Sequence, residues 1–225
     1  MLRRLTTLFL LAAFIAGCSV GPQPAPPSDV RPQGKALSHE DSQKVRAGAR
    51  YATTISGMRV YLYAADEESF VEEHDWCGGQ KGKTGYRGNY RWYLEPAKDQ
   101  PLLEQTTPVT GPDGPLLFGG GAQIAAELSL GGQKYLQVNQ YLNCTMQQVQ
   151  LFGLDQTNTL KRHPFQFADG TVTETPGTST DVEVKGALLY TGFYDRAKVY
   201  GGGWIRRSWA LKDGTFVEVK TEKME

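Results

Sequence analysis

Alternating apolar and polar positions run through most of the chain beyond residue 50, and they predict a series of short β-strands. Residues 58–64 (MRVYLYA) are rich in β-branched and aromatic side chains, and residues 86–96 (YRGNYRWYLEP) alternate until Pro96. Such side chains favour strands because they pack well on a pleated, half-buried surface. The apolar runs at 146–154 and 159–167 are expected to form the next strands.

Paired turn residues between these runs predict β-hairpins. Gly131-Gly132, Asp169-Gly170 and Asp213-Gly214 each follow an apolar run, and such pairs suit two-residue turns with positive φ. Repeated strands and turns predict a mainly β fold, an antiparallel sandwich or barrel. Residues 122–130 (AQIAAELSL) leave a helical alternative open, because Ala, Glu and Leu favour helices.

One or two short peripheral helices are expected beside the sheets. Ser38 and Asp41 have the spacing of a capping box, which predicts a polar, exposed helix over 38–49. Residues 65–76 (ADEESFVEEHDW) predict a second helix on the sheet, with Phe70 and Val71 facing inward. Residues 173–181 predict a loop, because Thr, Ser, Gly and Pro dominate that stretch.

The beginning of the chain has a different pattern. Arg3 and Arg4 precede an apolar run that is much shorter than the roughly 20 residues needed to span a bilayer, which predicts a secretory signal. Several prolines follow it and predict an extended tether. The expected organisation is a signal over 1–17, a tether over 18–37, a short helix over 38–49 and a periplasmic β domain over 50–225.

Ile15-Ala16-Gly17-Cys18 resembles the lipobox of bacterial lipoproteins. The resemblance implies cleavage before Cys18, acylation of its thiol and attachment to a membrane through that lipid. By resemblance to enterobacterial lipoproteins, Ser19 implies export to the outer membrane, with the domain on its periplasmic side or at the cell surface. The alternative is an ordinary secreted protein with a cysteine at this position.

Charge and cysteine content narrow the choice of partners. The chain has 24 basic and 24 acidic residues, so there is no basic field to bind nucleic acid, and no nucleic-acid partner is expected. With Cys18 acylated, Cys77 and Cys144 remain, and in an oxidising periplasm they are predicted to form a disulfide. Two buried thiols are the alternative.

Motifs for catalysis are weak, which favours a non-enzymatic role. Residues 77–85 (CGGQKGKTG) resemble a phosphate loop, but Cys77 stands where that motif needs its first glycine. The acidic residues at 72–75 lack the spacing of zinc or calcium ligands, so no metal or cofactor is expected. A glycosidase, which needs only two carboxylates, stays open as a third hypothesis.

Aromatic residues are concentrated at 86–93 and 190–209. Alternation places Tyr90 and Trp92 on one face of a strand. An exposed face of this kind would stack on sugars or bind a protein, since Tyr, Trp and Arg are enriched in protein interfaces. Filling of the core is the alternative. The candidate binding residues are Tyr90, Trp92, Trp204 and Trp209.

Residues 140–156 (QYLNCTMQQVQLFGLDQ) resemble the cysteine-bearing strand of surface-adhesin E-type lipoproteins. The resemblance implies a non-enzymatic β lipoprotein, although this chain lacks a second cysteine near its carboxyl terminus. We therefore expect an outer-membrane lipoprotein that assists an envelope protein assembly. A module that binds peptidoglycan or a surface polysaccharide is the second hypothesis.

Overall fold

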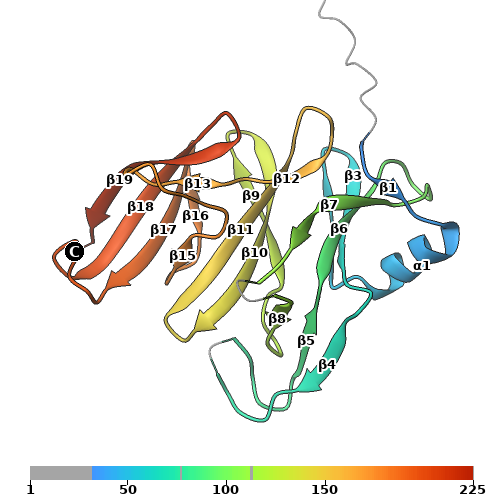
Figure 1. Ribbon diagram of the computed structural model, residues 1–225, viewed down its shortest axis with the longest axis horizontal. Helices are drawn as coiled ribbons and strands as arrows, with labels where there is room; N and C mark the ends of the chain where they lie inside the picture. Colours follow the sequence, from blue (N-terminus) through green and yellow to red (C-terminus); the bar gives the residue numbers. More distant parts are fainter. Residues whose placement is uncertain (1–31, 77, 112–113, 225) are drawn as a thin grey trace, which may run out of the picture.

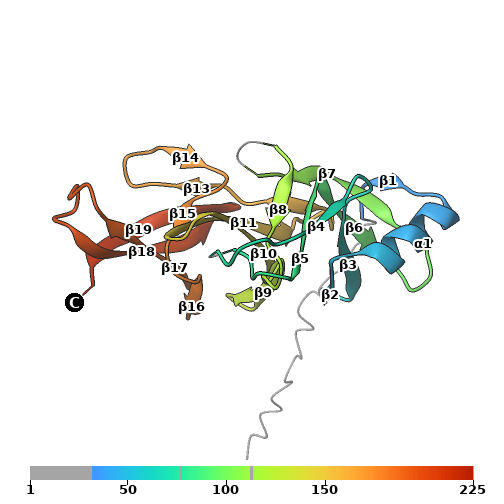
Figure 2. The ribbon, with the colours of Figure 1, turned by 90° about the horizontal axis from the view of Figure 1, so that it is seen from below.

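Three β-sheets stacked along the long axis dominate the molecule (Figure 1). The computed structural model describes residues 32–76, 78–111 and 114–224. A view from below shows the same order of sheets (Figure 2). The predicted mainly β, antiparallel architecture with a short peripheral helix is confirmed, and in the described part only β13 and β19 pair in parallel. No helix in that part is long and apolar enough to cross a membrane.

The first sheet, called the helix-side sheet, has the strand order β1-β7-β6-β3-β2 and carries the helix α1 (His39–Gly48). A small side sheet, β4-β5-β8, adjoins it. The strands of these two sheets are β1 (Lys35–Ala36), β2 (Tyr51–Ile55), β3 (Met58–Tyr63), β4 (Glu68–Val71), β5 (Thr84–Gly88), β6 (Tyr90–Glu95), β7 (Leu103–Val109) and β8 (Leu116–Phe118).

The middle sheet has the order β12-β11-β10-β9, with β15 also pairing to β11, and the C-terminal sheet has the order β14-β13-β19-β18-β17-β16. Their strands are β9 (Ala125–Leu130), β10 (Gln133–Asn143), β11 (Met146–Leu154), β12 (Leu160–Arg162), β13 (Phe165–Gln166), β14 (Val172–Thr173), β15 (Gly177–Thr178), β16 (Glu183–Lys185), β17 (Leu188–Asp195), β18 (Gly203–Lys212) and β19 (Thr215–Lys223).

The middle sheet is buried on both faces. Leu136 and Val138 of β10 pack into the core shared with the helix-side sheet, whereas Tyr135 packs into the core shared with the C-terminal sheet. Phe152 and Leu151 of β11 divide in the same way. Because neighbouring residues of a strand point to opposite faces, a strand between two cores needs apolar residues at consecutive positions.

Turn chemistry places the hairpins where the sequence predicts them. Gly131 and Gly132 have φ of 58° and 80° and join β9 to β10, so residues 125–130 form a strand and the helical alternative is wrong. Asp213 and Gly214, with φ of 47° and 79°, join β18 to β19. Within the predicted loop at 173–181, Gly177–Thr178 forms the short strand β15.

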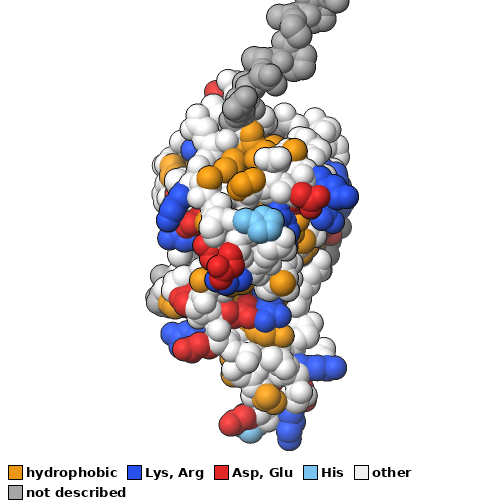
Figure 3. All heavy atoms as spheres, turned by 90° about the vertical axis from the view of Figure 1, so that its right-hand side faces the viewer, with side chains coloured by type: hydrophobic (Ala, Val, Ile, Leu, Met, Phe, Trp, Pro, Cys, Tyr) orange, Lys and Arg blue, Asp and Glu red, His pale blue; other side chains and the backbone are white. Residues whose placement is uncertain are grey.

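The helix α1 covers the outer face of the helix-side sheet. Its N-cap is Ser38, whose Oγ accepts a hydrogen bond from the Asp41 backbone N–H at 3.0 Å, as the capping box predicts. Val45 packs against Tyr61 and Tyr93, so one side of this polar helix is buried rather than wholly exposed. Seen from this end, acidic and basic side chains are interspersed over the surface (Figure 3).

The second predicted helix, at 65–76, is wrong. Its middle forms strand β4, which pairs with β5, and Val71 is exposed instead of facing inward. The approach to the strand is held by contacts to distant residues, because Asp66 accepts a hydrogen bond from the Asn89 backbone N–H and Glu67 forms an ion pair with Arg50. These tertiary contacts override the local preference of the acidic run for a helix.

Candidate functional site

The predicted aromatic residues separate into core and surface. Tyr90, Trp92 and Trp209 are 0% exposed, so for them the core alternative is the one observed. Their positions face the interior between sheets, where their large rings fill space. Burial and a hydrogen bond to Glu67 raise the pKa of Tyr90. Trp204 is different, because 43% of it is exposed.

Trp204 lies on the outer face of the C-terminal sheet. It is paired in register with Tyr194 of β17, and the two ring centroids are 5.5 Å apart. Tyr190 and Arg206 are on the same face, with the guanidinium 5.3 Å from the tyrosine ring centroid. No helix or further sheet in the described part of the chain covers this face, since α1 lies at the opposite end of the stack (Figure 1).

An apolar hollow adjoins Tyr194 at the edge of this face. It has a volume of about 460 Å³ and lies between the β10–β11 turn and the β17–β18 loop. Met146 comes from the turn, and Val199 and Tyr200 come from the loop. These side chains are exposed even though they are large and apolar. We call Met146, Tyr194, Val199, Tyr200 and Trp204 the end patch.

The β17–β18 loop is held by one carboxylate. Asp195 is buried at the end of β17 and accepts hydrogen bonds from the backbone N–H groups of Val199, Tyr200 and Gly202 at 3.1, 2.6 and 3.0 Å. Burial raises the pKa of Asp195, but these hydrogen bonds outweigh it and hold the pKa below its usual value. The loop then returns to β18 through residues 201–203, three glycines with positive φ.

Arg207 fixes the position of Tyr200 in the patch. The Arg207 guanidinium carbon lies 4.3 Å from the Phe193 ring centroid and 4.9 Å from that of Phe167. Its Nη2 donates a hydrogen bond to the Tyr200 hydroxyl at 3.2 Å, and the Tyr200 ring makes an edge contact with Phe193. Tyr200 is thus exposed yet held in a defined orientation.

The charges around the end patch are mainly positive. Arg196 and Lys198 are exposed in the loop, and the Lys223 side chain lies beside Gly203. Within residues 32–76, 78–111 and 114–224 none of these three cations forms an ion pair. The negative charge of Asp195 is directed inward to the loop backbone. The patch therefore combines apolar rings with uncompensated positive charge.

The sequence indicated Trp204 as a binding residue and placed Tyr194 and Tyr200 in the aromatic cluster at 190–209, but it gave no indication of Met146 or Val199. Met146 and Tyr200 are far apart in the chain, and pairing of the sheets brings them together. The detectable signal was local: Val199-Tyr200 precedes three glycines, so a bulky apolar pair stands at the tip of a turn. Large apolar side chains usually lie in the interior of a protein, so two adjacent ones at a turn are unexpected.

The other predicted positions are placed as follows. Glu72 is buried and accepts a hydrogen bond from the Gly120 backbone N–H, and Asp75 accepts one from that of Lys81. Among the described residues no group of three or more His, Cys, Asp or Glu could hold a metal ion. Cys144 lies in the β10–β11 turn, whereas Cys18 and Cys77 lie outside the described residues, so lipidation and the disulfide stay predictions.

Comparisons with known proteins leave the end patch as the basis for a functional assignment. No protein-family model, no curated protein and no solved structure matches this chain. Tyr194 and Trp204 lie on the outer face of the C-terminal sheet, whereas Tyr200 packs on Phe193 and Arg207 of the other face and meets Met146 in the hollow at the edge.

Proposed function

We propose that this chain is a lipid-anchored outer-membrane protein that binds a protein of the bacterial envelope through the end patch. The observation that carries the proposal is a hollow lined by the exposed apolar side chains of Met146, Tyr194, Val199 and Tyr200, with Trp204 in contact with Tyr194 beside it. Contiguous exposed apolar surface on a soluble domain marks an interaction site. The role is accessory to an envelope assembly and does not require catalysis.

The make-up of the end patch supports a protein as the partner. Trp, Tyr, Met and Arg are the residues enriched in protein interfaces, and a few such side chains carry most of the binding energy. Tyr200 is already oriented by Arg207, and Trp204 by its contact with Tyr194. A side chain that is ordered before binding loses less conformational entropy when the partner arrives.

The flanking charges favour a partner segment that is both apolar and acidic. Arg196, Lys198 and Lys223 surround the patch without ion pairs in the described part of the chain. Opposite charges at the rim of an interface speed association and suppress wrong partners. We infer that aromatic or aliphatic side chains of the partner enter the hollow and that its carboxylates face these three cations.

The anchor and the disulfide belong to the same proposal. The lipobox at 15–18 supports acylation of Cys18, and Ser19 supports sorting to the outer membrane. The neighbours of Cys77 support its pairing with Cys144, because Trp76 and Gly78 line one pocket together with Tyr141, three residues before Cys144. Such a bond would tie the loop after β4 to the end of β10.

Site-specific crosslinking in the native envelope tests this function. A photoreactive amino acid at Tyr200 of the full-length chain should capture one protein that mass spectrometry can identify. The same amino acid at Val172, which is 57% exposed but outside the patch, is the matched control. Capture from position 200 alone, reduced by Trp204→Ala, is the expected result. Equal capture at both positions, or none, contradicts the proposal.

One observation favours glycan binding as the second candidate function. The exposed pair of Tyr194 and Trp204 presents two rings 5.5 Å apart, and such rings can stack on the apolar face of a sugar. Sedimentation with purified peptidoglycan measures this directly. Sedimentation that is lost in Trp204→Ala and retained in Trp204→Phe would favour glycan binding. If the protein stays in the supernatant when peptidoglycan is pelleted, glycan binding of this kind is excluded.

A further inference from the structure

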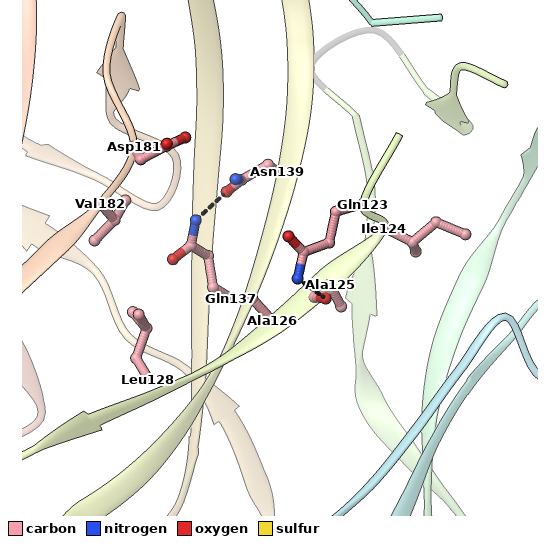
Figure 4. A pocket seen from close by; sticks show the side chains of 9 residues that line it. All are labelled: Gln123, Ile124, Ala125, Ala126, Leu128, Gln137, Asn139, Asp181 and Val182. Carbon is pink, nitrogen blue, oxygen red and sulfur yellow. Dashed lines mark hydrogen bonds between the residues drawn. The ribbon is translucent and has the colours of Figure 1, made fainter. Parts of the chain in front are cut away.

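A second hollow lies away from the end patch, between the middle sheet and the start of β16. It has a volume of about 210 Å³ (Figure 4). One wall is the face of β9 and β10 that looks toward the C-terminal sheet, and the other is the segment that leads into β16. We call it the inter-sheet pocket. Its lining is Gln123, Ile124, Ala125, Ala126, Leu128, Gln137, Asn139, Asp181 and Val182.

Gln137 is the buried polar group of this pocket. Its side chain is only 5% exposed, and its Nε2 donates a hydrogen bond to Asn139 Oδ1 at 2.6 Å. No donor in the described part of the chain reaches its Oε1, which points away from Asn139 into the pocket (Figure 4). The buried Gln150 differs, because its Nε2 donates to Thr110 O while its Oε1 accepts from Arg162. Gln137 Oε1 keeps access to solvent through the pocket, so water or a bound molecule can donate a hydrogen bond to it.

The rim adds further hydrogen-bond acceptors. The Asp181 carboxylate faces β10 across the pocket and forms no ion pair among the described residues (Figure 4). Gln123 donates its Nε2 to Ala125 O at 3.3 Å, which leaves its Oε1 available, while Asn139 offers its amide N–H groups as donors. No Lys or Arg lines the pocket. A ligand that fits must therefore supply several donors and carry no negative charge.

The remaining lining residues limit the size and shape of the ligand. Ala126, Leu128 and Val182 form an apolar wall beside the polar groups. A volume of about 210 Å³ lies below the roughly 300 Å³ at which pockets for drug-sized ligands begin. A single sugar ring has this combination, because its hydroxyls donate at the edge and its C–H groups form an apolar face.

We propose that the inter-sheet pocket binds one sugar-sized, hydroxyl-rich molecule that is neutral or positively charged. Gln137 Oε1 and the Asp181 carboxylate accept hydrogen bonds from its hydroxyls, Asn139 donates to it, and Leu128 and Val182 contact its apolar face. This site shares no residue with the end patch. Its ligand and the envelope partner are therefore independent, and failure of one leaves the other standing.

NMR titration of the ¹⁵N-labelled full chain with three related probes tests the pocket. Glucose is neutral, glucosamine at pH 6 is cationic and glucuronate is anionic, and all three have the same sugar ring. Glucose and glucosamine should shift the side-chain amide signals of Gln137 and Asn139 with Kd of about 1 mM, and glucosamine should bind more tightly because of Asp181. Glucuronate should cause no shift, since the carboxylate of Asp181 repels it.

Two variants separate the contributions of Gln137 and Asp181 to ligand binding. Gln137→Leu should weaken glucose binding about tenfold, the loss expected for one hydrogen bond, while Gln140→Leu on the opposite face of β10 should leave it unchanged. Asp181→Asn, at an exposed position, should reduce glucosamine affinity to that of glucose. If no signal shifts at probe concentrations well above about 1 mM, the pocket holds only water and the proposal is overturned. Equal shifts with glucuronate overturn it as well.

Discussion

The two outer sheets of the stack differ in what lies on their outer faces. Both carry aromatic residues there, Tyr61 and Tyr93 on the helix-side sheet and Tyr194 and Trp204 on the C-terminal sheet. The first pair is buried beneath α1 at 4% and 7% exposure, whereas the second is 49% and 43% exposed. The same strand pattern thus makes a core where a helix covers it and an exposed aromatic face where nothing in the described chain does.

The charged residues of the two faces differ in the same way. On the helix side, Glu95 is 3% exposed and accepts hydrogen bonds from the Tyr61 hydroxyl and Arg46 Nη2, both at 2.8 Å. On the C-terminal sheet, Arg206 and Glu222 form an ion pair at 2.6 Å that remains partly open to solvent. Removing one partner of a buried pair leaves a buried charge unpaired and is costly, whereas removing one partner of an exposed pair costs little. The helix side therefore tolerates the loss of its charged partners less well than the C-terminal face.

The largest difference in stability is expected between alanine variants of two tryptophans on strand β18. Trp209 is fully buried and donates from Nε1 to Thr191 Oγ1 at 2.9 Å, so Trp209→Ala should lower the free energy of unfolding by about 3–5 kcal/mol. Trp204→Ala should lower it by less than about 1 kcal/mol. Urea denaturation measures both. Similar losses would mean that Trp204 is a packing residue and that the outer face is not free.

A smaller difference in stability is expected between alanine variants of Glu95 and Glu222. Glu95→Ala leaves Arg46 and Tyr61 without their buried partner and should cost about 3 kcal/mol. Glu222→Ala, its counterpart on the C-terminal sheet, should change stability by less than about 1 kcal/mol. Thermal unfolding of the two variants side by side checks the difference. A large loss in Glu222→Ala would show that the uncovered face also relies on its ion pair.

The smallest effect concerns the loop of the end patch and its response to pH. Because the pKa of Asp195 is depressed in the folded protein, its contribution is present above the unfolded pKa and is lost as pH falls through the folded pKa. Hydrogen exchange at the Val199, Tyr200 and Gly202 amides should show protection at neutral pH and loss of it in acid. Asp195→Ala should reduce this protection about tenfold at neutral pH.

The amides of β10 provide the internal control for that experiment. Their protection should be the same in Asp195→Ala as in the parent chain, because the middle sheet is buried on both faces. If the three loop amides exchange equally fast in both proteins, Asp195 does not hold the loop. The positions of Val199 and Tyr200 in the end patch would then need another cause.

Local chemistry was enough to predict much of the fold. Hairpins at Gly131-Gly132 and Asp213-Gly214 follow from backbone conformations that favour these residues, and the start of α1 follows from the Ser38 cap. Where tertiary contacts decided the outcome, prediction from local preference failed. Residues 65–76 were predicted to form a helix, but the middle of this segment forms β4. Pairing with β5 and contacts to distant residues outweigh its weak helix propensity.

The sequence by itself determined the hairpins at Gly131-Gly132 and Asp213-Gly214 and the capped start of α1, because each depends on neighbouring residues. Only the tertiary structure decided which aromatic faces are covered, since alternation defines two faces of a strand but not what packs on either. It also brought together the residues of both proposed sites. Met146 meets Tyr200, and Gln137 meets Asp181, through sheet packing between segments that are distant in the chain.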